Sequence, residues 1–332
     1  MVRRVSEVMM DHIKHDLQST FEQVKSAVGW SVDKRISLLI ASYYVTTGKL
    51  FNVKLLLETS DAIKKKAGWF SPLRTHIHYM MAAFLQNNHI DASMSVDELL
   101  NKQETMKSMG FKSNAYSYLS AILLSSHPNQ QNEEAKRAKT LYDAMKSHHP
   151  FLTQSDDYPY AMMLGKLEGD PQERATTMNR YYTELRPQGF YMGNELQWMS
   201  QILTYASPKY DVSMASKAVH IRDQLKSSGI KVKMTHYVMV GFLAVLSHKD
   251  SDIQHVIDTY RELQDMKLFS WYKDMILPLA VQLETKHLID QKETSAVSLA
   301  TTIEMIMQAQ QAAMISTMAA TNAAIAASNN GS

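Results

Sequence analysis

The stretch Lys107–Ser113, KSMGFKS, decides the fold of this chain, because variants of it recur along the sequence. Each variant places a basic or polar residue before glycine or a substitute, and an aromatic or aliphatic residue after it. Glycine just past a helix tolerates the left-handed backbone that ends it, and a basic residue suits the negative end of the helix dipole. The stretch therefore predicts an elbow, meaning a tight connection between the two helices of an α-hairpin.

Seven such elbows follow one another at a nearly constant spacing of 38 to 42 residues. Their reference positions are Gly29, Gly68, Gly110, His149, Gly189, Gly229 and Lys267. A fixed period of this size is the signature of a repeat architecture in which each hairpin stacks on the next. We therefore expect an all-α chain, an α-solenoid-like stack of about seven α-hairpins with a period near 40 residues.

Polar residues near the elbows predict where helices begin. The segments Ser95–Glu98 and Asp170–Glu173 have capping-box spacing and are expected to open two helices. Serines that follow the elbows are expected to be N-caps, namely Ser31, Ser71, Ser113, Ser155 and Ser270. The second helix of each hairpin is the more apolar, which predicts that it is buried between its neighbours.

The chain divides into a helical-hairpin repeat domain, 1–290, and an Ala/Met-rich C-terminal helix with a frayed tail, 291–332. The last charged side chain is Glu304, and methionines and alanines then recur at helical spacing. This helix either caps the last repeat or mediates self-association. Polar side chains such as Gln308 and Asn322 argue against a transmembrane segment.

Composition excludes several classes of protein. With 45% apolar and 20% charged residues the chain has the makeup of a globular protein, and 11 glycines and 8 prolines are few for a many-stranded fold. The absence of cysteine excludes disulfides and thiolate chemistry. The net charge of +2 argues against bulk nucleic-acid binding. Without a signal sequence or a long apolar run, the chain is expected to be soluble and cytoplasmic.

The common catalytic motifs are absent: no phosphate-binding loop, dinucleotide fingerprint, nucleophile elbow or zinc helix occurs. His12 and His15 share a helix, but metal sites usually draw ligands from several elements. The carboxylate pairs Glu133–Glu134 and Asp156–Asp157 lie at expected helix N-termini, where negative charge is stabilising without catalysis. We therefore expect no cofactor and lean against an enzyme.

One internal match points to a binding surface. The segment Ser113–Tyr118 mirrors Ser155–Tyr160, so stacked repeats would align their aromatic and polar residues in a row. The candidate binding residues of this row are Arg74, His76, Tyr116, Tyr118, Tyr158, Tyr160, Trp198 and Tyr237. The row is either a packing ladder between hairpins or an aromatic binding groove. The elbow cations Lys107, Lys146, Arg186, Lys226 and Lys267 would form a second row.

Three short motifs carry a resemblance to a known family: Phe70–Arg74, Met109–Ser113 and Met307–Ala312. The chain resembles an uncharacterised helical family of Bacillus and its relatives, catalogued as domain of unknown function 4003. The resemblance covers most of the chain and implies a cytoplasmic bacterial protein, with no activity to carry over. Arg74 is the motif residue with functional chemistry, and a salt bridge or a cap near a helix start is the alternative reading.

Three functions fit the sequence. The first is a non-enzymatic helical-repeat scaffold that binds a protein or peptide. The second is an enzyme or small-molecule binder with a Tyr/His/Arg-lined pocket between hairpins. The third is a weak nucleic-acid binder that uses the elbow cations. They differ in what they require: an exposed aromatic row, a convergent pocket, or unpaired cations on one face.

Overall fold

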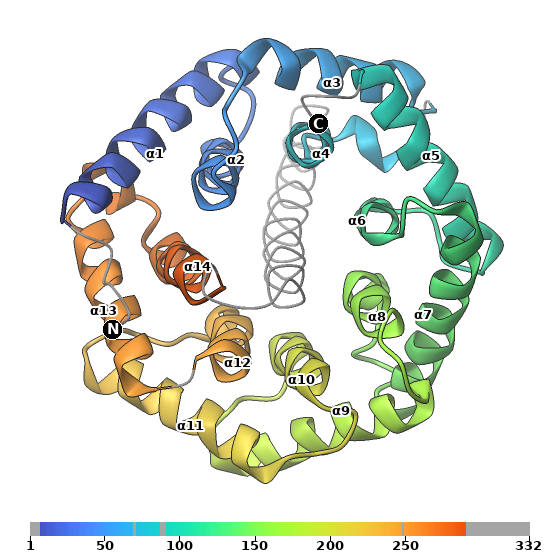
Figure 1. Ribbon diagram of the computed structural model, residues 1–332, viewed down its shortest axis with the longest axis vertical. Coiled ribbons are helices and arrows are strands. Elements are labelled where there is room, and N and C mark those ends of the chain that lie inside the picture. The colour runs from blue at the N-terminus through green and yellow to red at the C-terminus, as the bar shows by residue number, and fades with distance from the viewer. Residues whose placement is uncertain (1–6, 69–70, 87–90, 248, 290–332) are drawn as a thin grey trace, which may run out of the picture. The chain divides into compact units, whose positions relative to one another are not determined.

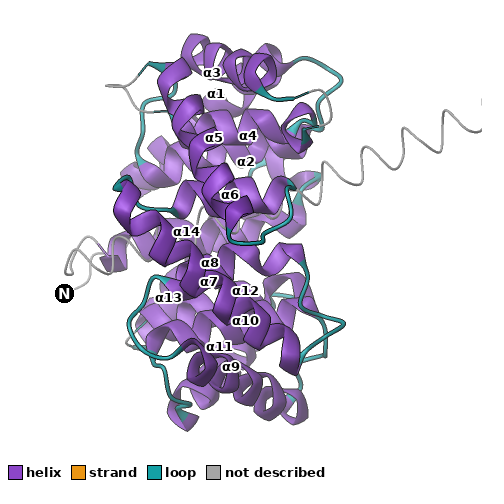
Figure 2. Ribbon diagram, turned by 90° about the vertical axis from the view of Figure 1, so that its right-hand side faces the viewer, coloured by secondary structure: helices purple, strands orange, loops and turns teal. Residues whose placement is uncertain are grey.

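The computed structural model describes residues 7–68, 71–86, 91–247 and 249–289. Within these ranges the chain forms fourteen α-helices and six 3-10 turns, without a strand, so the expected all-α class is confirmed (Figures 1 and 2). None of the described helices is long and apolar enough to cross a membrane. The expected C-terminal helix, 291–332, lies outside the described residues.

Contacts group the described residues into two compact units, which we name the N-terminal unit, 7–122, and the C-terminal unit, 123–289. The helices that begin in the N-terminal unit are α1 (Glu7–Val28), α2 (Lys34–Thr47), α3 (Val53–Lys66), α4 (Ile77–Leu85), α5 (Ala92–Ser108) and α6 (Ala115–Leu123). The helices of the C-terminal unit are α7 (Pro128–His148), α8 (Tyr158–Gly165), α9 (Pro171–Leu185), α10 (Asn194–Ala206), α11 (Val212–Ser227), α12 (Tyr237–Leu246), α13 (Asp250–Gln264) and α14 (Ile276–Ile289). The 3-10 turns are η1 (Pro72–Arg74), η2 (Ser155–Asp157), η3 (Arg186–Gln188), η4 (Met234–His236), η5 (Lys267–Ser270) and η6 (Lys273–Met275).

Helices that follow each other pack in pairs within each unit. In the C-terminal unit, each odd-numbered helix packs on the even-numbered helix after it. The odd-numbered helices also contact one another in chain order, and so do the even-numbered ones, which gives two layers (Figure 1). In the N-terminal unit α1 packs on α2 and α3 on α4, while α2 contacts α4 and α3 contacts α5.

The even-numbered helices of the C-terminal unit are buried almost all round, as their composition predicts. Every residue of α8 is buried, and so is nearly every residue of α12. The two helices of the first hairpin of this unit approach closely at Gly165, where a Cβ would lie 2.7 Å from the Cα and backbone nitrogen of Ala138. Glycine is therefore required at this crossing for lack of space.

The elbows end their helices with a left-handed glycine, as the sequence predicts, at four positions. Gly29, Gly110, Gly189 and Gly229 have φ of 84°, 91°, 91° and 87°. The residue after each of the last three glycines donates its amide to a carbonyl in the last turn, as in the bond of 3.0 Å from Ile230 to Leu225. This closure buries the apolar side chain that follows glycine. At Gly68 the expectation is wrong, because α3 ends through Ala67 in extended backbone.

Several predicted helix starts need correction. Asp170 caps α9 as expected, accepting from the Gln172 amide over 3.0 Å, but Ser95 lies inside a helix. Helix α5 begins at Ala92 because Asp91 accepts from the amide of Ser93 over 2.8 Å. Of the five serines only Ser71 accepts such a bond, from Leu73 in η1. Helix α2 is instead capped by a carboxylate, that of Asp33.

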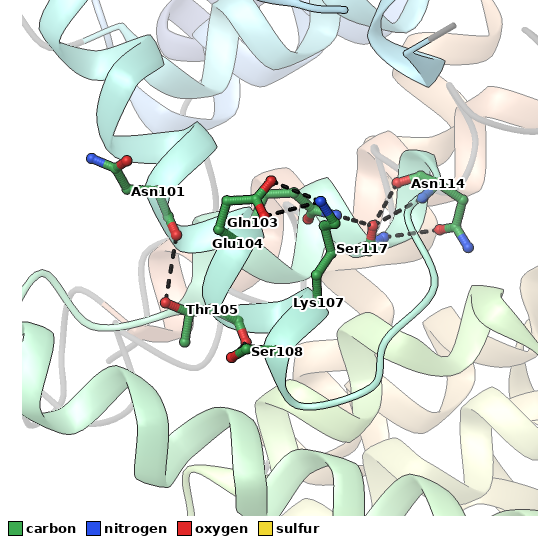
Figure 3. A network of polar contacts seen from close by, with 8 residues as sticks. All are labelled: Asn101, Gln103, Glu104, Thr105, Lys107, Ser108, Asn114 and Ser117. Atoms are coloured by element: carbon green, nitrogen blue, oxygen red, sulfur yellow. Dashed lines mark hydrogen bonds and ion pairs between the residues drawn. The ribbon is translucent and has the colours of Figure 1, made fainter.

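Buried polar pairs join the two helices of a hairpin. The hydroxyl of Ser60 on α3 meets Nδ1 of His78 on α4 at 2.9 Å, and burial lowers the pKa of His78 to about 4. The Gln103 amide donates over 2.8 Å to the hydroxyl of Ser117, which also accepts from the Asn114 amide (Figure 3). Each pair satisfies groups that would otherwise be buried without partners.

Basic side chains close the hairpins at the end opposite the elbow. Arg137 on α7 donates to the carbonyl of Gly165 and to that of Gly169, both at 2.9 Å, where α8 ends. Arg174 on α9 and Lys217 on α11 do the same for the last turns of α10 and α12. These cations satisfy carbonyls that a helix end leaves without partners. We call them the terminal clasps.

Candidate interaction surface

The elbows of the C-terminal unit form one edge of it. They are the segments 149–157, 186–193, 228–236 and 265–275, which connect α7 to α8, α9 to α10, α11 to α12 and α13 to α14. We call these four segments the elbow edge. They lie at the same end of neighbouring hairpins, because the odd-numbered helices pack side by side in chain order.

Hydrogen bonds join the first three elbows. The side-chain amide of Asn194, at the start of α10, donates to Oδ2 of Asp156 in the first elbow over 3.2 Å. The backbone amide of Tyr191 in the second elbow donates over 3.1 Å to the hydroxyl of Tyr237, which directly follows the third. The elbow edge is therefore continuous in this region.

A buried histidine ends the third elbow. Burial lowers the pKa of the His236 imidazole to about 4, and Asp274 in the fourth elbow acts in the opposite direction. Nδ1 of His236 accepts from the backbone amide of Lys233 over 3.3 Å, so the ring fastens the third elbow to the start of α12.

Large apolar side chains face water along this edge. Among the described residues of the C-terminal unit, Phe151, Tyr191, Met192 and Trp271 are 88%, 72%, 62% and 87% exposed, and all four lie on elbows. Val212, at 67%, is the other large apolar residue of this unit that is exposed to this degree, and it lies at the opposite edge. Exposed apolar residues that gather on one side of a molecule mark an interaction site.

Position within the elbow explains the exposure of Tyr191, Met192 and Trp271. In the second and third elbows the first apolar residue after the helix end packs back on the helix, so Phe190 and Ile230 are buried. An apolar residue further along has no such partner. Tyr191 and Met192 follow Phe190 directly, and Trp271 follows the buried Phe269 by two residues. These side chains are therefore not needed to close the helix ends.

Basic side chains accompany the exposed apolar ones. Lys146, Arg186 and Lys226 lie at the ends of α7, α9 and α11, as the elbow pattern predicts. Further exposed lysines of the elbow edge are Lys231, Lys233, Lys267 and Lys273. The exposed acidic residues beside them are Glu184, Asp223, Asp265 and Asp274. Lys107, which the sequence places in the same row, belongs to the N-terminal unit and pairs with Glu104 at 2.9 Å.

Beneath the first elbow lies a buried carboxylate. Asp157 is fully buried and accepts from the side-chain amides of Gln197 and Gln201 at 2.9 and 2.7 Å, and from the backbone amide of Gln154 at 2.9 Å. Burial and the neighbouring Asp156 raise the pKa of Asp157 to about 7. All three donors are uncharged amides. Two of them, Gln197 and Gln201, lie on α10, so their bonds fasten the first elbow to that helix.

The structure places the predicted binding residues of the N-terminal unit as follows. Arg74 is exposed, and its guanidinium donates to the carbonyls of Lys64, Ala67 and Gly68 at 3.3 to 3.4 Å, so it caps the end of α3. Arg74 was expected to cap the start of a helix, and it caps instead the C-terminal end of the helix before it, α3. His76 and Tyr116 are half-buried, while Tyr118 is buried.

The predicted residues of the C-terminal unit lie in its helix packing. Tyr158, Tyr160, Trp198 and Tyr237 are all buried. Tyr160 and Trp198 stack with ring centroids 6.2 Å apart, whereas Tyr158 packs on Tyr142. Tyr237 makes an edge contact with the ring of Phe190 at 4.9 Å. These contacts bring Tyr160 and Trp198 together, and the binding role of the row stays a prediction.

The sequence did not predict the exposed residues of the elbow edge, and it predicted Asp157 only as an acid at a helix start, without its burial. A signal was present at Tyr191, Met192 and Trp271, because each follows a buried apolar residue, Phe190 or Phe269, in its own elbow. No local signal identifies Asp157, because Gln197 and Gln201 reach it from a helix about forty residues away along the chain.

Comparison with known proteins places the chain in a family. It is 28% identical over 325 residues to the uncharacterised protein YeaA of Bacillus subtilis (strain 168), and this match covers 95% of the chain and 98% of that protein. No solved structure matches the chain significantly. The model of the family described as "Protein of unknown function (DUF4003)" matches residues 20–312. This confirms the resemblance seen in the motifs, and the chain belongs to the DUF4003 family.

Proposed function

We propose that this chain is a non-enzymatic helical-repeat scaffold that docks on a partner through the elbow edge of its C-terminal unit. The observation that carries the proposal is the placement of Phe151, Tyr191, Met192 and Trp271 on the first, second and fourth elbows of one edge. The contacts of the helices within each layer support the reading of this unit as a solenoid-like stack of hairpins. The absence of cysteine fits a protein of the reducing cytosol.

The proposed docking surface differs from the aromatic row that the sequence predicts as the binding surface. The aromatic row of Tyr158, Tyr160 and Trp198 is buried, so a partner would contact the elbows beside it. A pocket lined by tyrosine, histidine and arginine stays the alternative. It would require Tyr158 and Tyr160 to leave the packing against Tyr142 and Trp198.

Fractionation of a host lysate tests the proposal. We expect the wild-type chain to fractionate with a larger assembly or with membranes, and a variant with Phe151→Ser, Tyr191→Ser, Met192→Ser and Trp271→Ser to run as free protein. The matched control is Val212→Ser, which removes an equally exposed apolar residue from the opposite edge. Identical behaviour of the elbow variant and the wild type, with both chains folded by circular dichroism, would contradict the docking role.

A further inference from the structure

The apolar residues of the elbow edge protrude instead of lining a groove. Phe151 and Trp271 are 88% and 87% exposed, so hardly any of their surface contacts the rest of the protein. They lie on different elbows, separated along the edge by the elbows that carry Tyr191 and the lysines of 228–236. A side chain with no protein wall around it is buried only by insertion into a partner. The partner must therefore accept several separate apolar side chains at once.

The two edges of the C-terminal unit differ in their balance of charge. The elbow edge exposes the basic residues Lys146, Arg186, Lys226, Lys231, Lys233, Lys267 and Lys273, against the acidic Glu184, Asp223, Asp265 and Asp274. At the opposite edge the first two turns of the odd-numbered helices and the loops before them expose the acidic Glu133, Glu168, Asp170, Glu173 and Asp250, against the basic Lys166, Lys209 and Lys249. The helix dipole explains why acids gather at helix starts. The result is a basic edge that also carries the protruding apolar residues.

We propose that the elbow edge binds the surface of a membrane that contains anionic phospholipids. This inference rests on the docking function proposed above and names its partner. Tryptophan, tyrosine and phenylalanine favour the interface between lipid and water, where an aromatic ring enters the apolar layer and its polar group stays hydrated. A fluid lipid surface accommodates separate apolar side chains without matching pockets. Each lysine or arginine near an anionic surface adds about 1 kcal/mol, which corresponds to about a fivefold gain in affinity.

The geometry of the elbows suits such docking. Phe190 and Ile230 close their helices from below, so the neighbouring Tyr191 and Met192 can enter lipid without opening a helix end. Asp157 and its amide partners fasten the first elbow to α10, which holds Phe151 on a fixed base. The long side chains of the lysines allow the ammonium groups to stay at the level of the phosphates while their stems lie against lipid.

Sedimentation of the purified full-length chain with vesicles tests the inference. One set of vesicles contains phosphatidylcholine and phosphatidylglycerol in equal amounts, and the other contains phosphatidylcholine alone. We expect binding to the mixed vesicles that weakens as salt rises, and little binding to the neutral ones. Phe151→Ser combined with Trp271→Ser should lower the bound fraction by at least about tenfold. Lys267→Gln and Lys273→Gln should each lower the affinity about fivefold.

Two controls keep the outcome clear. Val212→Ser should bind mixed vesicles like the wild type, and all variants should show the same thermal unfolding as the wild type. Failure of the wild-type chain to bind mixed vesicles, or equal binding by the Phe151/Trp271 variant, would overturn the membrane proposal. If lysate fractionation still depends on the elbow residues in that case, the docking function stands and its partner is a protein. If fractionation is independent of them as well, both proposals fall.

Discussion

The side-chain amide of Gln201 donates a hydrogen bond of 2.7 Å to the fully buried carboxylate of Asp157. The bond joins α10 to the elbow before α8, and so links the first two hairpins of the C-terminal unit. Amide donors stabilise the carboxylate, but burial outweighs them and raises its pKa to about 7. A group with this pKa changes its charge within the physiological range.

Asp157 should make the stability of the chain depend on pH. Because its folded pKa lies above that of an unfolded aspartate, about 3.9, the folded state binds the extra proton between about pH 4 and 7. Its contribution to the free energy of unfolding is thus greatest at low pH and is lost as pH rises through 7. The loss is at most about 1.4 kcal/mol per pH unit. Urea unfolding of the wild type and Asp157→Asn across this range should reveal it.

The comparison with the variant is needed because other groups act in the opposite direction. Burial lowers the pKa of His78 and of His236 to about 4, so the unfolded chain binds more protons than the folded one between about pH 4 and 6.5. Subtracting the Asp157→Asn curve from that of the wild type removes this common slope. A parallel curve for Asp157→Asn would show that this carboxyl does not titrate in the range.

Gly165→Ala should destabilise the C-terminal unit. The new Cβ would lie 2.7 Å from backbone atoms of Ala138 on α7, which cannot move aside as a side chain could. Forcing the two helices apart should lower the free energy of unfolding by about 1 to 3 kcal/mol. Gly68→Ala is the control, because a Cβ there meets nothing within 4 Å. Chemical denaturation that finds the two variants equally stable would contradict the close crossing.

Ser117→Ala should destabilise the N-terminal unit. The Ser117 hydroxyl accepts from Gln103 at 2.8 Å and from the Asn114 amide at 3.0 Å, and it donates to the Asn114 carbonyl (Figure 3). Its removal leaves a buried amide of Gln103 without this partner, at about 2 kcal/mol. Ser108→Ala removes an exposed hydroxyl that bonds only within its own helix turn, and should change the free energy of unfolding by less than about 0.5 kcal/mol. A loss no larger than that of Ser108→Ala would count against the buried link.

The sequence predicts the helices and most elbows well, because these depend on residues close in the chain. The closure at Gly110 involves residues within one turn, as in the bond of 3.2 Å from the Phe111 amide to Met106. Local rules fail where two residues near each other could both cap a helix. Ser95 was the expected cap, but Asp91 caps the helix four residues earlier, and α5 then continues through Ser95. Serine caps were overestimated for the same reason, since Asp33 replaces Ser31.

The candidate site could not be predicted in the same way. Whether a tyrosine lies in a groove or in the core depends on helices from the next repeat. Tyr160 is buried because Trp198 stacks on it from α10, and the sequence offers no local sign of that contact. Trp271 is exposed for a related reason. Leu268 and Phe269 of the same elbow are already buried, and Trp271 stays in solvent.

The terminal clasps have an evolutionary consequence. Arg137, Arg174 and Lys217 each bind a carbonyl at the end of the second helix in their own hairpin, so each of these three hairpins carries both of its closures. A duplication or deletion of one period of about forty residues would carry elbow and clasp together and would leave no helix end open. Inserting a whole period should therefore disturb folding less than inserting half a period, which would leave one helix end unclosed.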